Sequence, residues 1–186
     1  MPILKLQALL PLVTYPDANS EIIAPNAAAV ARYLGADLHA LALEADIPAV
    51  SNALSNVVMN LPEMIRDAEK LSARRSADLR AAVTAACATA DVALTTETIR
   101  GHLPVLSDLA AEHARYHDIS LVGWSGGNPG TQMLAEAVVF GSGRPTLLFS
   151  EARPEVRLDH VAVAWDASRV AARALADARP LLKRAS

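Results

Sequence analysis

The sequence is poor in cysteine and in aromatic residues. Cys87 is its single cysteine, which excludes a disulfide framework within the chain and fits a reducing cytosol. Aromatic residues make up 4% of the chain, too few to build a platform on which nucleic-acid bases could stack. The hydrophobic fraction of 52% is mostly alanine, leucine and valine, a composition that suits the core of a helix-rich α/β protein.

An excess of positive charge and a long hydrophobic run are also absent. The formal net charge of -3 and the isoelectric point of about 5.9 provide no basic field for nucleic acid. No apolar run is long enough to span a membrane. The apolar start, residues 1–13, lacks the basic beginning and the small-residue cleavage site of a signal peptide. We therefore expect a cytoplasmic protein without nucleic-acid or membrane partners.

Segments with strand-like and helical patterns alternate along the chain. Apolar runs typical of strands at residues 3–13, 38–43, 92–99, 119–122 and 145–149 are separated by segments with helical periodicity at residues 25–34, 63–90, 103–116 and 129–140. This order predicts an α/β fold with a mainly parallel five-stranded sheet and helices on both faces. Ligands of such sheets bind beyond the carboxyl ends of the strands. Residues 44–62 give no clear signal and could form a short helix, a lid or a loop.

The stretch from Ile119 to Phe149 combines a strand, a glycine-rich loop, a helix and a second strand. Asn128 is a favoured N-cap, Pro129 fits the first helical position, and Gly141 is expected to end the helix with a positive φ. A glycine loop that opens a helix directs free N–H groups and the positive end of the helix dipole at an anion. The loop is either a phosphate cradle or a structural turn, and it is no P-loop because no lysine follows the glycines.

His113 and His117 lie four residues apart in a predicted helix, a spacing that can hold a metal ion. No third ligand accompanies them at a motif spacing. We therefore expect two solvated helix histidines and no metal site.

The end of the chain repeats the unit with which the chain begins. Residues 151–159 are a charged linker, residues 160–165 form a predicted strand, and residues 166–168 form a turn and helix cap before a helix at residues 170–182. Internal repetition of this kind indicates a second copy of the same unit. The expected organisation is one α/β domain at residues 1–150, the linker, and the first strand and helix of an incomplete second repeat at residues 160–186.

Three segments, together with the order of the elements, carry a resemblance to a known family. They are LVGWSGG, AEAVVFGSGRPTLLF and the restart HVAVAWDASRVAARALADA. With them the chain resembles the universal stress protein A family, in its tandem-domain form with the second domain truncated. The resemblance implies a Rossmann-like, doubly wound sheet, a homodimer, a role in the stress response and ATP binding at the strand ends.

The ATP motif of the family, G-x2-G-x9-G-[ST], matches this sequence in part. Gly123, Gly126, Gly130 and Thr131 stand at the matching positions, but three residues separate Gly126 from Gly130 where the family has nine. An acidic residue that the family places after its first strand is replaced by Thr14 here. The resemblance therefore implies a degenerate site for ATP or another adenine nucleotide.

Two further positions complete the predicted nucleotide site. Asp17 lies near the place of the missing acidic residue but out of step with it, and Leu43 ends the second predicted strand. No catalytic residue is placed at the loop, so we expect a binding protein with at most weak ATPase activity. The alternative is a ligand-free interaction module. In either case we predict a homodimer formed through the fifth strand and the C-terminal tail.

Overall fold

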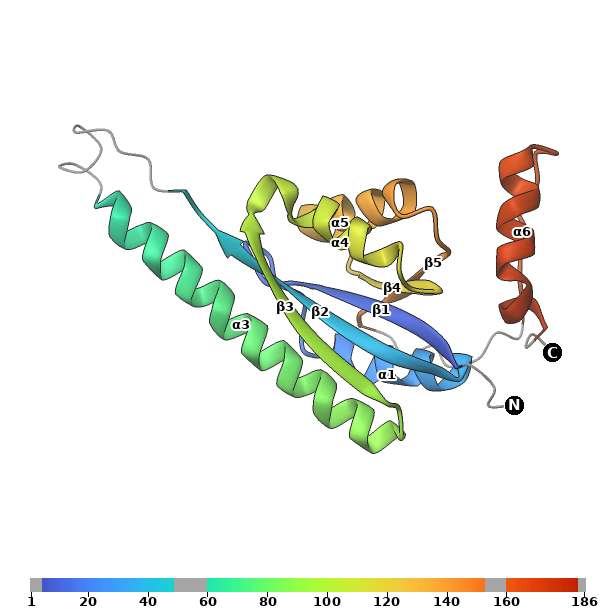
Figure 1. Ribbon diagram of the computed structural model, residues 1–186, viewed down its shortest axis with the longest axis horizontal. Helices are drawn as coiled ribbons and strands as arrows, with labels where there is room; N and C mark the ends of the chain where they lie inside the picture. Colours follow the sequence, from blue (N-terminus) through green and yellow to red (C-terminus); the bar gives the residue numbers. More distant parts are fainter. Residues whose placement is uncertain (1–4, 49–59, 153–159, 184–186) are drawn as a thin grey trace.

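The structure, a computed structural model, describes residues 5–48, 60–152 and 160–183. Its elements in chain order are β1 (Leu6–Val13), α1 (Ile23–Leu34), β2 (Ala36–Asp46), α3 (Leu61–Ala90), β3 (Leu94–His102), α4 (Leu103–Ala114), β4 (Ile119–Trp124), α5 (Pro129–Gly141), β5 (Thr146–Ser150) and α6 (Arg169–Leu182). The five strands form one parallel sheet in the order β3-β2-β1-β4-β5. Helices α1 and α3 cover one face, and α4 and α5 cover the other (Figure 1). The predicted α/β fold is thus confirmed.

Both faces of the sheet are buried, which explains the almost uninterrupted apolar run of β1. Ala8, Leu10 and Leu12 pack in the layer beneath α1 and α3. Leu9 and Val13 belong to the layer beneath α4 and α5. Successive strand residues point to opposite faces, so a strand covered on both sides must be apolar at nearly every position.

The ends of α1 and α5 follow the capping chemistry of their residues, with one exception. Gly35 ends α1 with a φ of 66°, and the Asn128 side chain caps α5 by accepting a hydrogen bond of 3.1 Å from the Thr131 N–H. The prediction for Gly141 is wrong, because it is the last residue of α5 and the positive φ, 67°, belongs to Gly143. A Cβ at Gly141 would lie 3.2 Å from the Ala111 Cβ, so this glycine permits close packing of α5 on α4.

The predicted strand at residues 160–165 is not formed. These residues have no regular secondary structure, and β5 remains the edge of the sheet. The cap that follows is confirmed, since the Ser168 hydroxyl accepts a hydrogen bond of 3.0 Å from the Ala171 N–H at the start of α6. The division into one domain and an incomplete repeat stays a prediction.

The unassigned stretch at residues 44–62 is resolved at its two ends. Residues 44–46 continue β2 and residues 61 and 62 begin α3, while residues 49–59 lie outside the described part of the chain. None of the helices described is long and apolar enough to cross a membrane.

Candidate functional site

Two loops meet at the carboxyl edge of the sheet, where the sequence predicts the ligand site. One follows β1, and the other is the glycine loop between β4 and α5. The Asn128 Nδ2 donates a hydrogen bond of 3.2 Å to the Asp17 carbonyl oxygen. A Cβ at Gly130 would lie 3.7 Å from Val13 Cγ1. The structure therefore brings Asp17 and Gly130 together, as the prediction requires, although their role in binding is not tested by this proximity.

The glycine loop offers donors to solvent. A Cβ at Gly126 or Gly127 would contact nothing within 4 Å, and Gly127 has a φ of 83°. In the described part of the chain, the N–H groups of Gly126, Gly127 and Gly130 find no acceptor. Four cavities that the described residues form are lined by other segments, so the loop is an open surface. A few backbone N–H groups without acceptors are sufficient for one anion.

Thr131, in contrast, is turned away from this surface. The residue is completely buried, and its hydroxyl has no partner among the described residues. Its backbone N–H is occupied by the cap from Asn128. The hydroxyl that the family motif would direct at a phosphate therefore does not reach the loop surface in this conformation.

Thr14 and Leu43 are brought together, but by a contact within the protein. The Thr14 hydroxyl donates a hydrogen bond of 2.6 Å to the Leu43 carbonyl oxygen, and it lies 2.7 Å from the Ser72 hydroxyl. Ser72 in turn accepts a hydrogen bond of 2.9 Å from the Ala45 N–H. Because a carbonyl can only accept, Ser72 must donate to Thr14. The residue in place of the family's acidic residue thus connects β1 to β2 and α3, and its side chain is completely buried.

Gly123 also has a role in packing. A Cβ at this position would lie 2.5 Å from the Ile23 Cδ1 and 3.0 Å from the Glu151 Cγ. Real Cβ atoms do not approach other heavy atoms so closely, so any larger residue at position 123 would force the Ile23 side chain of α1 to move. The match of Gly123 to the family motif therefore has a structural explanation that needs no ligand.

A buried carboxylate, which the sequence did not reveal, holds the loop after β1. Glu151 follows β5 and is 5% exposed, although it was expected to begin the linker. Its carboxylate accepts hydrogen bonds from the Asn19 Nδ2 and from the Ser20 N–H. The other side of Asn19, its Oδ1, accepts a hydrogen bond of 2.6 Å from the Val13 N–H. Asn19 and Glu151 therefore fix the loop that borders the candidate site.

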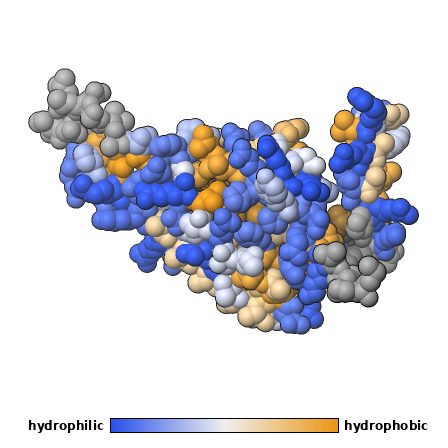
Figure 2. All heavy atoms as spheres, in the orientation of Figure 1, coloured by the Kyte–Doolittle hydropathy of each residue, from blue (hydrophilic) through white to orange (hydrophobic). Residues whose placement is uncertain are grey.

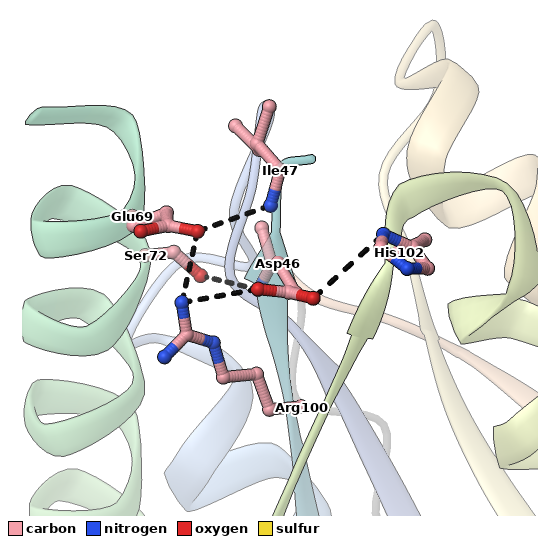
Figure 3. Close-up of polar contacts among 7 residues, drawn as sticks. Asp46, Ile47, Glu69, Ser72, Arg100 and His102 are labelled. Atoms are coloured by element: carbon pink, nitrogen blue, oxygen red, sulfur yellow. Dashed lines mark hydrogen bonds and ion pairs between the residues drawn. The ribbon is translucent and has the colours of Figure 1, made fainter. Parts of the chain in front are cut away.

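A second polar cluster lies at the same edge, where β2 and β3 end beside α3 (Figure 3). The Arg100 Nη2 lies 2.8 Å from the Glu69 Oε1 and 3.2 Å from the Asp46 Oδ1. His102 approaches the other oxygen of Asp46 at 3.7 Å. A hydrogen bond from the Ile47 N–H and the neighbouring guanidinium lower the pKa of the Glu69 carboxyl, and Glu69 raises the pKa of Arg100. Arg100 is paired with both carboxylates of this cluster, which favours a structural role.

A cavity of about 270 Å³ adjoins this cluster. Arg66 and Lys70 of α3 line it together with Arg100, Glu44 and Glu69. Arg100 is paired with Glu69 and Asp46. The Lys70 Nζ lies 3.8 Å from the Asp67 Oδ1. Two of the three basic side chains therefore already have carboxylate partners and offer an anion little positive field.

The prediction of solvated helix histidines is wrong for His117. His117 lies beyond the end of α4, and its Nε2 is 3.1 Å from the Nδ1 of His39 in β2. His113 lies 3.9 Å from Glu97 of β3. Within the residues described, no group of three or more histidine, cysteine, aspartate or glutamate side chains is arranged to hold a metal ion.

The comparisons with known proteins return similarities of fold. No protein-family model matches the chain, and no curated protein matches it. A crystal structure of a universal stress protein in complex with cAMP is similar over 79% of this chain and 98% of its own, with 14% identity and a TM-score of 0.40. The universal stress protein UspA from Lactobacillus plantarum is similar over 78% of this chain and 99% of its own, with 21% identity and a TM-score of 0.47. Both TM-scores lie below 0.5, so these likenesses carry no argument, and the chemistry of the site rests on this chain's own residues.

Proposed function

We propose that this protein is a universal-stress-protein-like binding protein that holds an adenine nucleotide, such as ATP, at the glycine loop between β4 and α5. The observation that carries the proposal is the set of three N–H groups, from Gly126, Gly127 and Gly130, that have no acceptor among the described residues at the carboxyl edge of the sheet. Backbone donors at the start of a helix favour a phosphate group because the helix dipole adds to their partial charge. The loop has donors for one phosphate group, and the exposed backbone around Asp17 would border the nucleoside.

The protein would act by binding and not by turnover. Burial raises the pKa of the Cys87 thiol to about 11, so this side chain is protonated at neutral pH and is no nucleophile. The Thr131 hydroxyl and the Thr14 hydroxyl are both buried. We place the protein in the cytoplasm, where a free cysteine stays reduced.

A charge placed on the loop tests the proposal. Gly126→Asp should weaken ATP binding by about tenfold or more, because like charges near a protein surface repel by several kcal/mol. A Cβ at this position meets no protein atom within 4 Å, so the fold should be unaffected. Gly126→Asn has the same shape without the charge and should retain most of the affinity. Equal dissociation constants for the two variants, measured by isothermal titration calorimetry, would contradict the loop as the phosphate site.

The second candidate function is a dimerisation module, and the exposed edge of the sheet favours it. Strand β5 lies at the edge, its Leu148 is 47% exposed, and Phe140 of the neighbouring α5 is 85% exposed. Helix α6 lies beyond this edge and carries apolar side chains on its surface (Figures 1 and 2). A cavity of about 570 Å³ separates the two, lined by Leu147, Val139 and Val170 among others. An unpaired strand edge with apolar neighbours is a template for association.

Removal of residues 157–186 should then weaken a homodimer, as measured by multi-angle light scattering at several protein concentrations. Leu148→Lys, in the full chain, should have the same effect, because a lysine on an edge strand opposes edge-to-edge pairing. Met64→Lys, on the exposed surface of α3, is the matched control and should leave the mass unchanged. A dimer of unaltered stability in both the truncated chain and Leu148→Lys would exclude this interface.

A further inference from the structure

Three histidines and one glutamate meet on the face of the sheet that α4 covers, at the opposite end of the strands from the glycine loop. His39 lies early in β2, Glu97 lies in β3, His113 lies in the last turn of α4, and His117 follows that helix. The His39 Nε2 is 3.2 Å from the Glu97 Oε2, and its Nδ1 is 3.1 Å from the His117 Nε2. The His117 Nδ1 is 2.9 Å from the His113 carbonyl oxygen. These contacts form a continuous chain from a carbonyl to a carboxylate.

A count of protons shows what this chain of contacts requires. Three hydrogen bonds need three protons, and the two groups at the ends, a carbonyl and a carboxylate, can only accept. Two neutral imidazoles supply only two N–H groups. If His117 donates to the His113 carbonyl, and His39 donates to His117, the His39 Nε2 is left with a lone pair that faces the Glu97 carboxylate. One additional proton on the histidine pair completes all three hydrogen bonds.

We propose that His39, His117 and Glu97 form a proton-binding site, which takes up a single proton shared by the two imidazoles and neutralised by the Glu97 carboxylate. The proton completes the hydrogen bonds between β2, β3 and the end of α4, but it also places a charge in a partly buried site. Because burial disfavours the charged form, the site fills only as the pH falls. Without the proton, Glu97, whose side chain is 44% exposed, faces a lone pair and is expected to turn to solvent. The two histidines therefore titrate as a unit and not as independent groups.

The groups around His39 determine the pH range in which the site takes up its proton. Burial lowers the pKa of His39, the charge of His117 lowers it further, Glu97 raises it, and His113 lowers it. Asp37, on the same face of β2, is paired with Lys5 at 3.2 Å. Since the pKa of His39 lies below its ordinary value of 6.5, the folded state takes up its proton at a lower pH than the unfolded chain. Stability from this group is therefore complete above pH 6.5 and is lost as the pH falls from there through the folded-state pKa.

Histidine NMR on the full chain tests the site. Long-range ¹H–¹⁵N spectra between about pH 4.5 and 8.5 report the protonation of each ring nitrogen. We expect His39 and His117 to change together with a common midpoint, because they share one proton. Independent, ordinary curves for His39 and His117 would overturn the proposal.

Glu97→Gln distinguishes a shared proton from general packing. The glutamine amide can donate to the lone pair of neutral His39, so the third proton is no longer needed, and the common midpoint should fall by about one pH unit. Glu112→Gln removes the same charge from the exposed side of α4 next to His113 and should leave the midpoint in place. An unchanged midpoint in Glu97→Gln, or an equal shift in Glu112→Gln, would overturn the site.

Discussion

Replacing Asn19 with alanine is expected to lower the free energy of unfolding by about 3 kcal/mol. The substitution removes the acceptor of the Val13 N–H and the donor to the Glu151 carboxylate. A hydrogen bond to a charged group contributes about 1.5–3 kcal/mol, and a neutral one about 1 kcal/mol. The loss is large because the Glu151 carboxylate is buried and would have to be desolvated without its partner. Urea unfolding followed by circular dichroism measures the change.

The control for this prediction is Glu151→Gln, which retains an acceptor oxygen for Asn19 but removes the charge. Glu151→Gln should lower the free energy of unfolding clearly less than Asn19→Ala does. The double variant should be more stable than the sum of the two single effects predicts, because the two side chains are in contact. Additive losses would mean that the contact between Asn19 and Glu151 does not hold the loop.

Gly123→Ala should also destabilise the protein, by about 1–3 kcal/mol, although it adds a single methyl group. The added Cβ would lie 2.5 Å from the Ile23 Cδ1, and both residues lie in a closely packed interior that cannot absorb the overlap without movement. The measurement is the midpoint of urea unfolding, compared at a constant m-value.

Ile23→Val removes the Cδ1 atom that the new methyl group would meet. By itself it should cost about 0.5–1.5 kcal/mol, as expected when one buried methyl group is lost. In the double variant with Gly123→Ala, Ile23→Val should restore part of the stability that Gly123→Ala removes. The free energy of unfolding of the double variant should exceed the value expected from additive effects by about 1 kcal/mol. A double variant that shows the full sum of both losses would contradict the packing role of Gly123.

Local patterns were sufficient to predict the fold. The alternation of strand-like and helical segments determines an α/β sheet, and the Asn128 cap and the Gly35 stop follow from the chemistry of neighbouring residues. The wrong predictions concern residues whose structure depends on their neighbours in the fold and not on the local sequence. Residues 160–165 have the composition of a strand, but a strand forms only where a partner is available. Gly141 has the residue type of a C-cap, whereas its observed role is close packing on Ala111.

The candidate site was less predictable, because its side chains pair across the fold. Thr14 contacts the carbonyl of a residue 29 positions away, and Asn19 contacts Glu151 at a separation of 132 residues. His39 and His117 are 78 residues apart. No periodicity or motif signals such pairs. The adjacent ends of parallel strands were the one available signal, and they indicated the edge of the sheet but not which side chains are buried there.

The most direct test of the proposed function is the ligand carried by the purified wild-type protein. The protein is denatured, and the supernatant is analysed by liquid chromatography and mass spectrometry, before and after incubation with ATP and removal of excess. We expect an adenine nucleotide that the native protein retains and releases on denaturation, in an amount that Gly126→Asp reduces. An empty protein that also fails to bind added ATP would contradict the proposal and would leave the exposed edge of β5 as the functional surface.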